Sequence, residues 1–168
     1  GWRAWRSGPA MRLPSAQAVG AVSAPPPTAS VLSLQQVQPR SPRSAQAERL
    51  GIADRVEWFG ALPQGEVIER YRNADLFTLA SRVGDDGDRD GLPNVLMEAQ
   101  SQALACVATD VSAIPELIVD GETGVLIPSE DSAALSAAIV DLAGNPERRL
   151  FLGRAGEARV RGTFSFTV

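Results

Sequence analysis

The apolar positions of this chain follow two different periods from residue 55 onward. Short apolar or alternating runs predict strands at residues 55–59, 76–80, 104–108 and 125–127. Apolar residues at helical spacing predict helices at residues 66–72 and 94–102, a helix capped by Asp131, and a last helix capped by Asn145 and Pro146. Strands that alternate with helices are typical of a parallel sheet, so the expected fold class is α/β.

The predicted strands differ in how much of each is buried. The run at 55–59 alternates polar and apolar residues, which suits an edge strand, whereas the runs at 76–80 and 104–108 are typical of strands buried on both faces. The only cysteine, Cys106, lies in the second buried run and is expected to act as a small hydrophobe. A single thiol excludes a disulfide scaffold, which is compatible with a cytoplasmic location.

The first 47 residues have a different composition from the rest. They contain five arginines, no acidic residue and a run of Pro, Ser and Ala, so we expect a disordered or non-native, linker-like segment. Short strands at 18–22 and 31–34 are the exceptions that the pattern allows. The domain boundary is then expected near 47, with a partial domain at 48–168. A basic segment of this kind also allows peripheral contact with an acidic membrane surface.

The motif from Asp90 to Glu98, DGLPNVLME, carries most of the chemical information. Pro93 suits the first position of a helix, because its missing N–H would have no helical partner there. The turn leaves four backbone amides available for a phosphate, those of Gly91, Leu92, Asn94 and Val95. The two flanking carboxylates are strong acceptors for sugar hydroxyls. The motif therefore predicts a ligand with a diphosphate in the middle and a sugar at each end.

Several other classes of function are excluded by composition. The chain has no histidine, which excludes histidine-based triads and the usual zinc sites. Its net charge of −4 argues against nucleic-acid binding. Residues 86–91 imitate the start of a calcium loop, but Met97 stands where the loop needs a bidentate glutamate, so we expect no metal. No stretch reaches the length of a transmembrane helix.

The motif stands among others in a characteristic order. They are RVEWFG at 55–60, ADLFTLAS at 74–81, EAQS at 98–101, LACVATD at 104–110, IPELI at 114–118 and DGETGVLIP at 120–128. In this order, from about residue 47 to 166, the chain resembles the C-terminal, donor-binding half of GT-B retaining glycosyltransferases of family 4, the group 1 type of bacterial mannosyl- and glucosyltransferases. The resemblance implies a Rossmann-like sheet and transfer of a sugar from a nucleotide-diphosphate sugar, without a cofactor.

The resemblance also implies roles for individual residues. Asp90, where the family usually has Glu, would hold hydroxyls of the transferred sugar, near the backbone amides of Gly91 and Leu92. Asn94 and Val95 would bind the phosphates, and Glu98 would accept bonds from the ribose hydroxyls. Backbone groups at Phe59 and Gly60 would contact the base. No residue of the chain is assigned as catalytic.

The chain departs from the family pattern in two places. It lacks the Gly-Arg…Lys-Gly segment whose basic side chains meet the diphosphate, and no first or second strand is recognisable before Leu50. In a sheet of order 3-2-1-4-5-6 those two strands separate the third from the fourth, so we expect an incomplete domain that is inactive alone. The glycan or lipid-linked acceptor would bind a missing N-terminal domain. Ala103 replaces a glycine, which costs about 1 kcal/mol if the position needs a positive φ.

Two other functions remain compatible with the motif. One is a nucleotide-sugar epimerase of the same architecture, and the other is a non-catalytic module that binds nucleotide sugars. A dinucleotide oxidoreductase is disfavoured, because no G-x-G-x-x-G follows a strand. The identity of the sugar, the base and the acceptor stays open.

Overall fold

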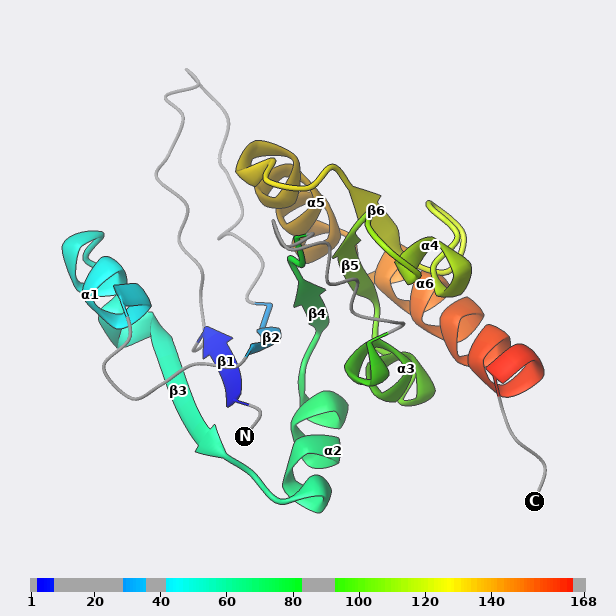
Figure 1. Cartoon of the computed structure of the whole chain (residues 1–168), viewed down its shortest axis with the longest axis horizontal. Coiled ribbons are helices and arrows are strands. Elements are labelled where there is room, and N and C mark those ends of the chain that lie inside the picture. Colours follow the sequence, from blue (N-terminus) through cyan, green and yellow to red (C-terminus); the bar gives the residue numbers. More distant parts are fainter. Residues whose placement is uncertain (1–2, 8–28, 36–41, 83–92, 165–168) are drawn as a thin grey trace.

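The computed structural model describes residues 3–7, 29–35, 42–82 and 93–164. Six strands form one sheet of order β3-β1-β2-β4-β5-β6, from β3 at one edge to β6 at the other (Figure 1). The strands are β1 (Arg3–Ser7), β2 (Val31–Gln35), β3 (Val56–Ala61), β4 (Leu76–Leu79), β5 (Cys106–Thr109) and β6 (Val125–Ile127). The strands at 55–59, 76–80, 104–108 and 125–127 are thereby confirmed within a residue or two, and the first of them is an edge strand as expected.

The helices follow the predicted alternation. They are α1 (Pro42–Arg49), α2 (Gln64–Asn73), α3 (Asn94–Ser101), α4 (Ile114–Leu117), α5 (Ser132–Gly144) and α6 (Pro146–Arg159), with a 3₁₀ turn η1 (Ala53–Arg55) and a π-helical turn η2 (Val160–Phe164). The predicted caps are confirmed: Asp131 accepts from the Ala134 amide at 2.8 Å, and Asn145 accepts from the Arg148 amide at 3.0 Å. Pro93 is the N-cap in extended conformation, one position before its expected place.

All but one of the described strands point the same way. Strands β2, β4, β5 and β6 pair in parallel, and β1 is antiparallel to both β2 and β3, so β3 runs in the same direction as the parallel strands. The parallel α/β sheet predicted from the sequence is therefore present, with β1 reversed within it.

The opening segment contributes two strands to the sheet. The sequence analysis expected most of this segment to be disordered or linker-like. β1 and β2 lie between β3 and β4, at the two positions for which no strand was recognisable before Leu50. The expectation of a disordered or linker-like segment over 1–47 is therefore wrong for residues 3–7 and 31–35, whereas the short strand allowed at 31–34 is present. The physical reason is that the facing edges of β3 and β4 need hydrogen-bonding partners. The strand allowed at 18–22 lies outside the described residues.

Polar contacts hold the start of β2 against the start of β4. The Ser30 amide and hydroxyl both donate to Asp75 Oδ2, at 2.8 and 3.0 Å. Arg149 of α6 lies 3.4 Å from the other oxygen of that carboxylate. The contacts of Asp75 with Ser30 and Arg149 join distant parts of the chain, so β2 has a specific position in this domain.

Helices cover both faces of the sheet, which gives three layers. On one face Leu32, Phe77 and Cys106 pack with side chains of α2, α3 and α4. On the other face Val31 and Leu76 pack with side chains of α5 and α6. Neighbouring residues of a strand therefore point to opposite faces, as the period of a strand requires. Cys106 is fully buried as predicted, and this burial raises the pKa of its thiol far above the usual range.

Helix α3 ends in a Schellman motif at the residue that replaces a glycine. Ala103 has φ +56°, its amide donates to the Gln100 carbonyl at 2.9 Å, and the Leu104 amide donates to the Ala99 carbonyl at 3.3 Å. Ala103 therefore has the positive φ for which the sequence analysis gives a cost, and its β-carbon is strained there.

We expect Ala103→Gly to raise the free energy of unfolding by about 1 kcal/mol, because glycine adopts a positive φ without steric cost. Urea denaturation followed by circular dichroism measures the change. Ala137→Gly, at an exposed position inside α5, is the matched control and should lower stability by about 1 kcal/mol. Equal destabilisation by both substitutions would contradict the strain at Ala103.

Candidate functional site

The carboxyl ends of β4, β5 and β6 lie at one edge of the sheet, because the strands are parallel. The segment after β4 is tied to this edge: the Thr109 hydroxyl donates to the Ser81 carbonyl at 2.8 Å. The Asp110 amide donates to the Ile127 carbonyl at 2.8 Å, which joins the ends of β5 and β6. In open α/β sheets ligands bind outside this edge, so it is the candidate site.

Helix α3 is the next described helix after β4 in the chain. Asn94 and Val95 occupy its first turn, where backbone amides have no partner within the helix. Their binding of a phosphate stays a prediction. Asp90, Gly91 and Leu92 lie outside the described residues. Their contacts with a sugar therefore stay predictions.

Glu98 lies one turn inside α3 and is half-buried. Both of its carboxylate oxygens accept hydrogen bonds from α2. Gln64 Nε2 donates to Oε1 at 3.0 Å, and the Tyr71 hydroxyl donates to Oε2 at 3.3 Å. The carboxylate is thus held between two helices. Its contact with a ribose remains a prediction.

Tyr71 is a residue of the site that the sequence analysis did not identify. Its side chain is 1% exposed, and its ring meets the Phe77 ring edge-on, with centroids 5.6 Å apart. Burial, together with the negative charge of Glu98, raises the pKa of the Tyr71 phenol far above its usual range, so the hydroxyl stays protonated and can donate. The signal in the sequence is a lone tyrosine on the apolar face of a helix, where its hydroxyl needs a partner.

The predicted base-contacting residues, Phe59 and Gly60, lie near the end of strand β3. The Phe59 ring is buried, and the Arg70 guanidinium lies 4.1 Å from its centroid, so the ring cannot stack on a base. The prediction concerned backbone groups at Phe59 and Gly60, and only these remain for a contact with the base. Since Gln64 follows this strand closely and touches Glu98, the end of β3 and the ribose-binding candidate lie in the same region.

Two further features bear on the kind of site. Among the residues that the structure describes, no group of three or more acidic or cysteine side chains is placed to hold a metal ion. Within the same residues, no helix combines the length and the apolar character needed to cross a bilayer.

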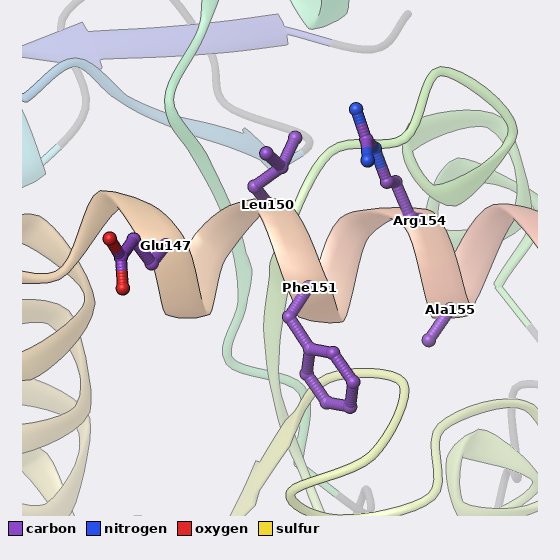
Figure 2. Close-up of a pocket in the computed structure, with 5 residues that line it drawn as sticks. All are labelled: Glu147, Leu150, Phe151, Arg154 and Ala155. Atoms are coloured by element: carbon purple, nitrogen blue, oxygen red, sulfur yellow. The ribbon is translucent and has the colours of Figure 1, made fainter.

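A separate hollow of about 470 Å³ lies on α6 (Figure 2). Leu150 and Arg154 project from one side of the helix, and Phe151 and Ala155 from the other. Leu150 and Phe151 are 52% and 61% exposed. None of the residues predicted from the motif lines this hollow, and its surface is apolar, so it is not the candidate site.

Comparison with known proteins identifies the class that this fold and site define. Residues 38–159 match the family described as "Glycosyl transferases group 1". This match covers most of the chain, and the chain therefore belongs to the glycosyltransferase group 1 family. The family resemblance stated from the sequence is confirmed.

Individual relatives agree with this assignment. The putative colanic acid biosynthesis glycosyltransferase WcaL of Salmonella typhimurium is 39% identical over 56% of this chain and 23% of its own length. The C-terminal domain of a group 1 glycosyltransferase, LpcC, from Francisella tularensis superposes with a TM-score of 0.64 at 22% identity, over 76% of this chain and 67% of that one. HepE of Anabaena, in complex with UDP-glucose, has a TM-score of 0.66 at 20% identity, over 73% of this chain and 32% of HepE.

These solved structures show the GT-B type of fold, and the described part of the chain matches a C-terminal domain. The chain spans less than a third of the length of the curated relatives it matches.

Proposed function

We propose that this chain is the donor-binding part of a retaining glycosyltransferase and binds a nucleotide-diphosphate sugar at the carboxyl edge of the sheet. The observation that carries the proposal is the Glu98 carboxylate, held one turn inside α3 beside the first-turn residues Asn94 and Val95. HepE, which shares this fold, is solved in complex with UDP-glucose, and this supports the same class of ligand here.

Each part of the donor has a partner of suitable chemistry. The amides and positive dipole end of α3 bind the diphosphate, and Glu98 accepts hydrogen bonds from the ribose hydroxyls. Asp90 with Gly91 and Leu92 receives the transferred sugar. Aspartate is shorter than the usual glutamate by one C–C bond, about 1.5 Å, so the sugar would sit deeper or differ in kind. Backbone groups at the end of β3 receive the base.

The reaction needs more than this chain supplies. The leaving diphosphate is stabilised by fixed dipoles and cations, as in other electrostatically assisted transfers. The dipoles are present, whereas the basic Gly-Arg…Lys-Gly segment of the family is not in the sequence. A glycan or lipid-linked acceptor would bind a separate N-terminal domain, at the cytoplasmic face of a membrane. No metal or cofactor takes part.

The isolated 168-residue chain should therefore bind donor and transfer nothing. We expect calorimetry to detect binding of UDP-glucose or GDP-mannose, and we expect no release of nucleoside diphosphate when a bacterial glycan and lipid extract is added. Binding of neither donor would refute the proposed function. Release that depends on the extract would refute the inactivity of the isolated chain, and would leave donor binding standing.

A further inference from the structure

Helix α2 presents two hydrogen-bond donors to one carboxylate. Gln64 is the first residue of α2, and Tyr71 lies two turns further along, so both side chains project from the same face of the helix. Their donor atoms lie 3.0 and 3.3 Å from the two oxygens of Glu98. One donor is thus placed on each oxygen.

This arrangement leaves a defined set of acceptor positions. An ionised carboxylate offers about four lone-pair positions, two on each oxygen. The contacts from α2 occupy one position on each oxygen, so one remains on each. Two acceptor positions, separated by the width of a carboxylate, match the two neighbouring hydroxyls of a ribose.

The two donors also restrict the Glu98 side chain before any ligand binds. A glutamate on a helix surface otherwise loses side-chain entropy when it is fixed in one rotamer. A side chain already held in the bound geometry avoids part of that loss on binding. Since Tyr71 is buried and its ring is packed against Phe77, its hydroxyl is itself fixed in place.

A purely structural role for Tyr71 must be distinguished from a role in holding the Glu98 side chain. Its single hydroxyl proton is shared between Glu98 Oε2 and the Val95 carbonyl, each 3.3 Å away, and the carbonyl on its own would satisfy a buried phenol. Loss of stability in a Tyr71 variant therefore says nothing about Glu98. The informative readout is the dependence of nucleotide binding on the ribose hydroxyls.

We infer that Gln64 and Tyr71 are positioning residues that hold the Glu98 carboxylate in the orientation that accepts both hydroxyls of the ribose. This inference rests on the proposed function, because it concerns how Glu98 receives the donor. Neither residue touches the nucleotide in this role; both act through Glu98.

The test compares UDP with 2′-deoxy-UDP, or GDP with 2′-deoxy-GDP, by calorimetry on the whole chain and its variants. We expect the chain itself to bind the ribonucleotide about tenfold or more tightly than the deoxynucleotide. Tyr71→Phe keeps the ring and removes only the donor, and Gln64→Ala removes the other donor from an exposed position. In each variant the ribonucleotide should bind about five- to tenfold more weakly while the deoxynucleotide changes less, so the ratio falls.

Two substitutions on α3 serve as matched controls. Ser101→Ala removes a hydroxyl that donates to the backbone carbonyl of Glu98 at 2.7 Å, and Gln102→Ala removes an amide that accepts from Arg72. Both leave the donors to the carboxylate in place, so both should keep the full preference for the ribonucleotide. Thermal melting of every variant shows whether it is folded, and Gln64→Ala decides the result if Tyr71→Phe is unstable.

The outcomes separate the two hypotheses. If the chain prefers the ribonucleotide and Glu98→Ala abolishes that preference, but Tyr71→Phe and Gln64→Ala retain it, the positioning role is overturned and the proposed function stands. If the chain binds no nucleoside diphosphate at all, the proposed function fails and the inference fails with it.

Discussion

Replacing Glu98 by alanine is expected to weaken binding of nucleoside diphosphates at least about a hundredfold. Two hydroxyls that donate to a carboxylate contribute about 1.5–3 kcal/mol each, and tenfold in affinity corresponds to about 1.4 kcal/mol. The substitution removes both acceptors, while the amides of the first turn of α3 remain. Calorimetry with UDP and with GDP measures the loss directly.

The control for this substitution removes a glutamate that lies outside the site. Glu69 lies on α2 and is 2.7 Å from Arg72, with both side chains mostly exposed. Such surface pairs contribute little to stability, so Glu69→Ala should bind nucleotides like the unaltered chain. A Glu98→Ala protein that is folded and keeps its affinity would show that this carboxylate does not meet the ligand.

Replacing Gly153 by alanine is expected to lower the free energy of unfolding by at least about 3 kcal/mol. A β-carbon at this position of α6 would lie 2.0 Å from the Ala103 carbonyl oxygen and 2.8 Å from its carbon. Both atoms belong to the backbone at the end of α3, so they cannot turn aside as a flexible side chain would. The helix must move away from the sheet, which opens the core beneath it.

Urea denaturation of Gly153→Ala and of a matched variant measures this effect. Gly144, the last residue of α5, has nothing within 4 Å of an added β-carbon and does not have a positive φ. Gly144→Ala should therefore leave stability unchanged or raise it by up to about 1 kcal/mol. If the two variants unfold at the same urea concentration, α6 does not pack on α3 as closely as described.

Local sequence patterns were sufficient for the elements around the site. The caps at Asp131 and Asn145 depend on a few neighbouring residues, and both were predicted correctly. The position of Glu98 one turn inside a helix also follows from the spacing of its motif. Such features need no knowledge of the rest of the chain.

Contacts between distant segments explain what the sequence analysis missed. Strands β1 and β2 lie in a segment rich in proline and serine, and their pairing with β3 and β4 depends on edges supplied by residues further along the chain. β propensity is strongly context-dependent, so composition alone underestimates such strands. The hydrogen bonds of Gln64 and Tyr71 to Glu98 likewise join two helices 27 to 34 residues apart in sequence.

The central claim is that the first turn of α3 binds a diphosphate while Glu98 binds the adjoining ribose. The most direct test is a crystal structure of the chain with UDP or GDP bound. The account predicts phosphate oxygens within hydrogen-bonding distance of the amides of Asn94 and Val95, and ribose hydroxyls on the Glu98 carboxylate. A nucleotide bound elsewhere, with Glu98 still held only by α2, would contradict it.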